Sequence, residues 1–211
     1  MAELQTDEEK VEAIKKWWKE NGVSVIAGVA IGLGAVFGWR AWVSYHTSVA
    51  QRASIAFEQL LATTAADQRE SAEKQAEILD DDFGGTPYAM FSDLALAKVR
   101  LEAGDRDGAI DALQSAIDRA PEPGLATLAS LRLARVLIDA GELERASKLI
   151  DAQDADGAFS ADLAALRGDI AVAQGRTDAA RAAYRQAIDD GAAEARLIEL
   201  KLRELPTHDA G

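Results

Sequence analysis

The hydrophobic pattern is dominated by one uncharged stretch near the N-terminus, residues 21–39. A helix rises about 1.5 Å per residue, so a stretch of this length spans about the hydrocarbon core of a bilayer. A segment in lipid must satisfy its own backbone hydrogen bonds, so the stretch should be helical despite its glycines. All four tryptophans of the chain lie at its two ends, where indole rings favour the headgroup layer. The pattern predicts a transmembrane helix over residues 21–43.

Two other interpretations of this stretch are possible, a buried core helix and a cleavable signal peptide. A buried core helix rarely runs so long without a polar residue. A cleavable signal peptide could use Ser48-Val49-Ala50 as its small-x-small site, but the apolar run is longer than a signal core. Bulky Trp42 and Tyr45 also stand where a cleavage region is normally small and polar. An uncleaved anchor is therefore the favoured interpretation.

The cations near the two ends of the stretch predict its orientation. Four lysines precede it within residues 1–20, whereas only Arg40 and Arg52 follow it within a comparable distance. Because lysine and arginine are retained on the cytoplasmic side, residues 1–20 should form a short cytoplasmic head. Everything after about residue 43 should lie across the membrane.

Two pairs of glycines inside the stretch have helix–helix spacing. Gly28 and Gly32 are four residues apart, as are Gly34 and Gly38, so each pair lies on one helix face. Such faces let a second transmembrane helix approach closely. The alternative is that glycine is simply common in membrane spans. We expect a transmembrane helix contact at these glycines.

After the stretch, the polar and apolar positions follow a helical period. Residues 44–64 and 67–79 predict two helices, the second closed by three aspartates at 80–82. A breaker follows at residues 83–87, with Thr86 as a helix N-cap and Pro87 at the first helical position.

The rest of the chain repeats itself around three glycines, Gly104, Gly141 and Gly175, spaced 37 and 34 residues apart. A small residue stands seven positions before each glycine, and an alanine stands five positions after it. These repeat-defining residues are Ala97, Ala134 and Gly168 before the glycines, and Ala109, Ala146 and Ala180 after them. Period and order are typical of tetratricopeptide repeats, in which two helices cross closely beside a turn.

Helix pairs of this kind bury their apolar faces only by stacking, so we predict an all-α, tetratricopeptide-like solenoid. The domain should cover residues 44–205, with residues 44–85 as a degenerate first pair. Residues 192–205 predict a capping helix stopped by Pro206, and residues 206–211 form a tail.

Composition narrows the classes of function. The chain has 211 residues with 48% hydrophobic and 28% charged content, as in globular proteins. Its formal net charge is −13, which argues against nucleic acid as a partner. It has no cysteine, so disulfides, thiol nucleophiles and thiolate metal sites are excluded.

Residues for catalysis are scarce. The two histidines, His46 and His208, are far apart in the sequence, and no nucleophile elbow, phosphate loop or dinucleotide fingerprint occurs. The aspartates at 80–82 lack the glycine and bidentate glutamate of a calcium loop, so a solvated helix end is favoured. We expect no catalytic residue, no metal site, no cofactor and no small-molecule substrate.

Several segments carry a resemblance to a known family: residues 11–22, the glycine-rich span, its exit at 38–42, and the repeat segments 131–135 and 162–169. The resemblance is to the YfgM family of ancillary subunits of the bacterial Sec translocon. It covers nearly the whole chain. It implies a bacterial inner-membrane protein that associates with the SecYEG translocon and with a membrane-anchored periplasmic chaperone of the prolyl-isomerase type.

The resulting hypothesis is a membrane-tethered adaptor that helps pass translocated polypeptides to periplasmic chaperones. The resemblance also implies a link to a cytoplasmic stress-response regulator. A scaffold or regulator of a stress-response pathway is therefore an alternative. An enzyme displayed on the same anchor is a third.

Overall fold

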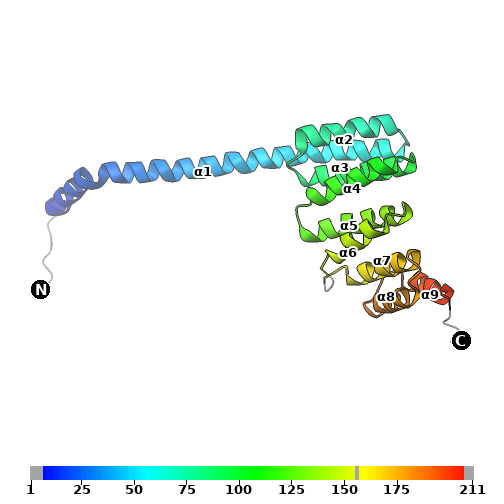
Figure 1. Ribbon diagram of the computed structural model, residues 1–211. Helices are drawn as coiled ribbons and strands as arrows, with labels where there is room; N and C mark the ends of the chain where they lie inside the picture. The colour runs from blue at the N-terminus through cyan, green and yellow to red at the C-terminus, as the bar shows by residue number, and fades with distance from the viewer. Residues whose placement is uncertain (1–6, 155–156, 207–211) are drawn as a thin grey trace, which may run out of the picture. The chain divides into compact units, whose positions relative to one another are not determined.

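The computed structural model describes residues 7–154 and 157–206, and their regular structure is entirely α-helical (Figure 1). His208 and most of the predicted tail lie outside the described residues. The helices are α1 (Asp7–Ala65), α2 (Arg69–Phe83), α3 (Pro87–Glu102), α4 (Arg106–Asp118), α5 (Pro123–Asp139), α6 (Leu143–Asp151), α7 (Ser160–Ala173), α8 (Thr177–Asp189) and α9 (Ala195–Glu204).

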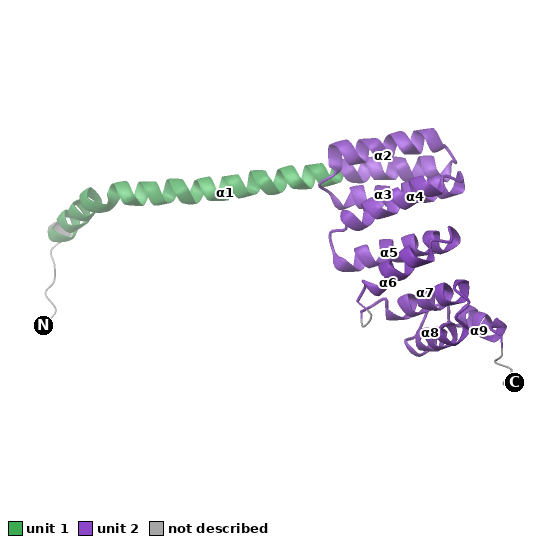
Figure 2. Cartoon of the chain, viewed as in Figure 1, with its two compact units in different colours: residues 1–51 green, residues 52–211 purple. Residues whose placement is uncertain are grey.

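The chain divides into two compact units, residues 1–51 and 52–211 (Figure 2). Helix α1 is uninterrupted, so the polar head, the apolar stretch and the helix expected at residues 44–64 belong to one element. No helix terminator occurs between these segments, and all of them have helical sequences. The predicted boundaries at residues 20 and 43 therefore do not coincide with helix ends.

The first unit presents its apolar residues outward. Val23 is 82% exposed and Ile31 is 73% exposed, although both are large and hydrophobic. By length and composition α1 could cross a membrane, and only 6% of its most apolar window is buried. A core helix would be mostly covered by the rest of the chain. The described structure thus disagrees with the buried-core interpretation of this stretch.

The second unit is a stack of helix pairs (Figure 2). Helices adjacent in the sequence pack together, α3 with α4, α5 with α6, and α7 with α8, while α9 packs on α8. The first pair consists of the last part of α1 and helix α2, where Leu60 and Leu79 are fully buried. The described chain is therefore the predicted all-α solenoid, with α9 at its C-terminal end.

Glycines end the helices at recurring tight turns. Gly104, Gly141 and Gly175 have φ of 77°, 77° and 72°, a region that glycine enters without steric strain. In the first of these turns the Asp105 N–H donates to the Arg100 carbonyl at 2.8 Å, and the Gly104 N–H donates to the Leu101 carbonyl at 3.0 Å. This is the Schellman pattern, which satisfies carbonyls that the helix end leaves open.

The same pattern recurs at the end of α8, which the sequence did not predict. Gly191 has φ of 82°, and the Ala192 N–H donates to the Ala187 carbonyl at 3.0 Å. The turn ends the second helix of its pair, whereas the repeating glycines end the first. Spacing between repeats therefore did not reveal it.

The junction between α2 and α3 differs from the expected one in detail. Helix α2 continues through the aspartates at 80–82 to Phe83. Phe83 packs against the buried cluster that contains Leu60 and Leu79, and Asp80 pairs with Arg119. Thr86 does occupy the N-cap position of α3, with Pro87 at its start. Its hydroxyl, however, donates backward to the Phe83 carbonyl at 2.8 Å instead of capping α3.

Candidate functional site

The four glycines of the predicted transmembrane contact lie in the first unit, on α1. A Cβ atom built on Gly28, Gly32, Gly34 or Gly38 meets no other atom within 4 Å. Packing within the described part of the chain therefore does not require glycine at these positions. At the exit of the apolar stretch, the Trp42 and His46 rings lie 4.4 Å apart between centroids, so His46 joins an aromatic cluster.

The small residues singled out in the repeats lie in the core of the second unit. Ala97 is 2% exposed, whereas Ala109, Ala134, Ala146 and Ala180 are fully buried. The first four belong to one core cluster that extends from α3 to α7, and Ala180 belongs to a second cluster formed by α7, α8 and α9. Buried alanines at these places allow the paired helices to approach closely.

Gly168 lies against the ring of Tyr184 at the α7–α8 crossing. A Cβ atom at Gly168 would be 2.3 Å from Cε1 of Tyr184 and 2.4 Å from its Cδ1. The tyrosine is 2% exposed, and its hydroxyl donates to Oδ1 of Asp169 at 2.7 Å. Lys201 of α9 also donates to Asp169 Oδ1, at 2.7 Å. Burial and this carboxylate raise the pKa of Tyr184, so the ring stays neutral and fixed.

A groove runs along α3 and α5 in the second unit. It consists of two cavities of about 480 and 440 Å³ that share Leu94, Lys98 and Arg132 as lining residues. The first cavity is also lined by residues of α3, α4 and α5, namely Ala97, Leu101, Arg106, Leu113, Arg135, Val136 and Asp139. The second also takes residues from the end of α1, from α3 and from α5, namely Phe57, Leu61, Thr64, Ala65, Phe91, Ala95 and Leu128.

The groove combines an apolar floor with cations. Lys98, Arg106, Arg132 and Arg135 are exposed side chains along it, and Asp139 is the one carboxylate lining either cavity among the described residues. The net charge of the residues that line the groove is therefore positive, whereas the chain as a whole has a net charge of −13. Apolar lining with a few oriented polar groups is the usual composition of a binding site.

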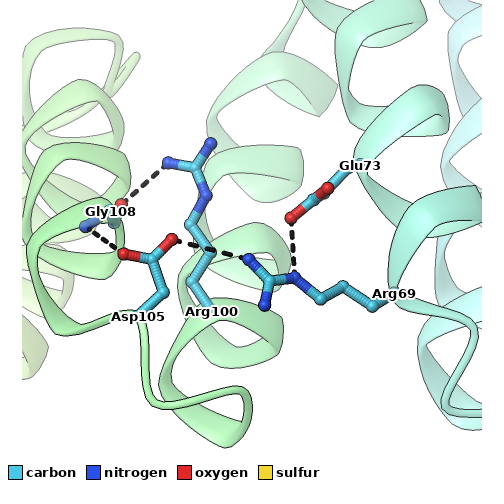
Figure 3. A network of polar contacts seen from close by, with 5 residues as sticks. All are labelled: Arg69, Glu73, Arg100, Asp105 and Gly108. Atoms are coloured by element: carbon cyan, nitrogen blue, oxygen red, sulfur yellow. Dashed lines mark hydrogen bonds and ion pairs between the residues drawn. The ribbon is translucent and has the colours of Figure 1, made fainter.

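A third cavity, of about 520 Å³, is polar and lies beside α2 and α3. Figure 3 shows the contacts around it: Arg69 bonds Glu73 at 2.9 Å and lies 3.7 Å from Asp105. Asp105 caps α4 by accepting from the Gly108 N–H at 3.0 Å, and Arg100 donates to the Gly108 carbonyl at 2.8 Å. These carboxylates and guanidinium groups satisfy one another and tie α2 to the next helix pair, which is a structural role.

A second polar chain lies close by. The Ser115 hydroxyl donates to Oδ2 of Asp93 at 2.7 Å, and Nε of Arg119 lies 3.7 Å from the same oxygen. Arg119 also pairs with Asp80. Burial raises the pKa of Asp93, and the Ser115 hydrogen bond and the charge of Arg119 only partly oppose this effect. Among the described residues, no group of three His, Asp or Glu side chains is placed to hold a metal ion.

The raised pKa of Asp93 predicts a pH-dependent contribution to stability. Above the unfolded-state pKa, near 3.8, the folded chain binds the Asp93 proton more tightly than the unfolded chain does. The free energy of unfolding therefore falls as pH rises from this value through the folded-state pKa. Asp93→Asn should remove this pH dependence. The free energy of unfolding of the variant should therefore increase relative to that of the wild type between about pH 4 and neutral pH.

The measurement is urea unfolding of both proteins across this pH range. Asp111→Asn, an exposed aspartate on the same repeat, is the matched control and should leave the slope unchanged. A parallel pair of pH profiles for wild type and Asp93→Asn would contradict the prediction.

Comparison with known proteins identifies the family. The chain matches the tetratricopeptide repeat-like domain family over residues 15–207. It is 32% identical over 206 residues to an ancillary SecYEG translocon subunit of Aggregatibacter actinomycetemcomitans, covering 97% of this chain and 100% of the relative. This chain belongs to that family of ancillary SecYEG translocon subunits.

Other members of the ancillary SecYEG translocon subunit family agree over similar lengths. The Haemophilus influenzae subunit is 30% identical over 206 residues, covering 97% of this chain and all of the relative. The Escherichia coli K12 subunit is 28% identical over 203 residues, covering 95% and 97% of the two chains. The resemblance to the YfgM family is confirmed, as is the tetratricopeptide-like fold.

The sequence did not reveal the groove. Arg132 and Arg135 stand among apolar residues of α5, and nothing in their local sequence marks them as part of a binding site. Lys98 belongs to α3, which is separated from α5 in the chain by all of α4. Only the stacking of the repeats brings these cations to one groove.

Proposed function

We propose that this protein is a membrane-anchored adaptor at the Sec translocon that helps pass translocated polypeptides to periplasmic chaperones through protein–protein binding. The observation that carries the proposal is the nearly full-length similarity to ancillary SecYEG translocon subunits. An exposed apolar helix suited to a membrane and an apolar groove on a repeat domain support it. The proposal assigns binding, and no catalysis, to the repeats.

The proposed organisation follows the hydrophobic pattern. Residues 1–20 form a cytoplasmic head, residues 21–43 cross the bacterial inner membrane, residues 44–205 form the periplasmic repeat domain, and residues 206–211 form a tail. Proposed partners are the SecYEG translocon and a membrane-anchored periplasmic chaperone of the prolyl-isomerase type. No nucleic acid or small-molecule substrate is part of the proposal.

A tether explains how a weak binder could act at the translocon. A repeat domain held beside the exit meets each emerging segment at a high effective concentration, which raises occupancy without new contacts. The anchor therefore contributes to the function by keeping the repeat domain at the translocon exit. Without it, the repeats would meet translocated chains only at their bulk concentration.

The span glycines provide a direct test. Gly28→Leu combined with Gly32→Leu should leave membrane insertion intact, because leucine is favoured in bilayers. The double variant should nevertheless lose SecYEG and chaperone on affinity purification from membranes, since leucine side chains would keep a partner helix away. Beyond the backbone of α1 itself, no described residue lies within 4 Å of a Cβ at these positions, so a loss would report an external contact.

The matched control replaces two bulky residues nearby, Val25→Leu with Val29→Leu, and should retain both partners. Equal recovery from the glycine variant would place the contact in the repeat domain instead. If the wild-type chain itself recovers neither SecYEG subunits nor a chaperone after crosslinking, the adaptor proposal fails.

A further inference from the structure

The two cavities of the groove adjoin at a cationic boundary. Lys98 of α3 and Arg132 of α5 line both cavities, as does Leu94. On either side the walls are largely apolar, with Phe91 in one cavity and Leu101 in the other. A bound molecule that fills both cavities must therefore pass these two positive side chains.

The arginines of the groove have no partners within the described part of the chain. Arg106, Arg132 and Arg135 are exposed and make no salt bridge or side-chain hydrogen bond there. Asp139 lines the same cavity without pairing with any of them. Elsewhere Arg69, Arg100 and Arg119 each contact a carboxylate or carbonyl of another helix or of its cap. The chain as a whole has a net charge of −13, but these unpaired arginines make the groove locally positive. An anionic group would therefore be attracted to it.

We propose that this groove binds a polypeptide segment that carries two large apolar side chains with carboxylates between them. The apolar side chains occupy the two cavities, and the carboxylates pair with Arg132 at the boundary, where Lys98 already bonds Glu102 of its own helix at 3.4 Å. This inference rests on the proposed adaptor function and names the kind of segment that the repeats recognise. The segment belongs to a translocated chain.

Charge and shape both favour this occupant. Arginine pairs with carboxylates through two parallel hydrogen bonds, which fixes the position of the bound segment along the groove. The apolar cavities supply the burial that an exposed ion pair alone does not, since such pairs are screened by salt. A nucleic acid would carry the right charge for the arginines but would be repelled by the chain's net charge of −13.

The test measures peptide binding by the full-length chain in detergent micelles, using fluorescence anisotropy. The probe is a short fluorescein-labelled peptide with two leucines separated by glutamates. One matched peptide has glutamine in place of each glutamate, and another has serine in place of each leucine. The first peptide should bind most tightly, and both matched peptides should bind more weakly by roughly ten- to a hundredfold. Its affinity should also fall with added salt.

Variants assign the binding to the groove. Arg132→Glu should weaken binding of the glutamate peptide by a similar factor and should favour a peptide with lysines between the leucines. Arg185→Glu makes the same charge change at an exposed arginine on α8 and should have little effect. Leu101→Ser removes an apolar wall that is 41% exposed, whereas Leu200→Ser changes a leucine that is 45% exposed on α9, away from the groove. Of these two leucine substitutions, only Leu101→Ser should weaken peptide binding.

Several results would overturn the inference. Equal affinity for the glutamate and glutamine peptides would show that charge does not contribute to recognition. Equal losses of affinity from Arg132→Glu and Arg185→Glu would show that the peptide does not bind in the groove. Binding that appears only as the chain self-associates would make a second copy the occupant. Because the three peptides are compared on the wild-type chain, a variant that fails to fold would still leave the charge preference tested.

The same variants separate this inference from the adaptor proposal. Arg132→Glu that loses the peptide but still recovers SecYEG supports a peptide groove distinct from the translocon contact. A wild-type chain that binds the glutamate peptide but recovers no SecYEG would contradict the adaptor while leaving the groove intact.

Discussion

Replacing Gly168 with alanine should lower the free energy of unfolding of a fragment covering residues 44–211 by about 1–3 kcal/mol. The new Cβ atom would lie 2.3 Å from the Tyr184 ring, far inside contact distance. The ring cannot easily retreat, because it is 2% exposed and its hydroxyl is bonded to Asp169. Since the buried core residues of the second unit all follow residue 52, the fragment contains its complete core. Urea unfolding followed by circular dichroism measures the change.

The clash has a matched control and a compensating variant. Gly85→Ala should change stability little, since its Cβ meets nothing within 4 Å. Tyr184→Leu should be less damaging in the Gly168→Ala protein than in the wild type, because the smaller side chain makes room for the new methyl group. If the two substitutions prove additive, overlap with the ring is not the cause of the loss.

Labelling of introduced cysteines should give an all-or-none result for the proposed topology. The chain contains no cysteine, so any signal comes from the introduced one. Ala182→Cys, on an exposed position of α8, should react with a membrane-impermeant maleimide in spheroplasts. Ala13→Cys, in the lysine-rich head, should react only after the cells are lysed, because the proposed topology places that head in the cytoplasm.

Both variants should react equally in lysed membranes, which controls for their accessibility. The reverse pattern in intact spheroplasts would invert the proposed orientation. It would also remove the adaptor proposal, because the repeats would then lie on the side from which chains depart.

The fold class could be predicted because its signals are local and repeated. Gly104, Gly141 and Gly175 each end a helix through a turn that needs a left-handed residue, and this requirement is the same in every pair. The end of α2 was less predictable. Three consecutive aspartates predict a terminus, but Phe83 gains contacts in the core and extends the helix beyond them. Packing between helices overrides local preference here.

The candidate site was the least predictable part. Arg132 and Arg135 have the spacing of an ordinary exposed face, and nothing local distinguishes them from the paired arginines of other helices. Arg132 and Arg135 form part of a binding groove only because Lys98 and the apolar walls from α3 and the end of α1 lie beside them. Such a juxtaposition of non-adjacent helices follows from stacking, which a period in the sequence indicates but does not specify in detail.

The nearest-neighbour packing of the helices also has a consequence for folding kinetics. Most contacts of the second unit join helices that are adjacent in the sequence, as in α3 with α4 and α7 with α8. Chains with such local contacts close short loops first and fold quickly. Each helix pair can therefore begin to form before the next becomes available to fold, starting at the α1–α2 pair and proceeding toward α9.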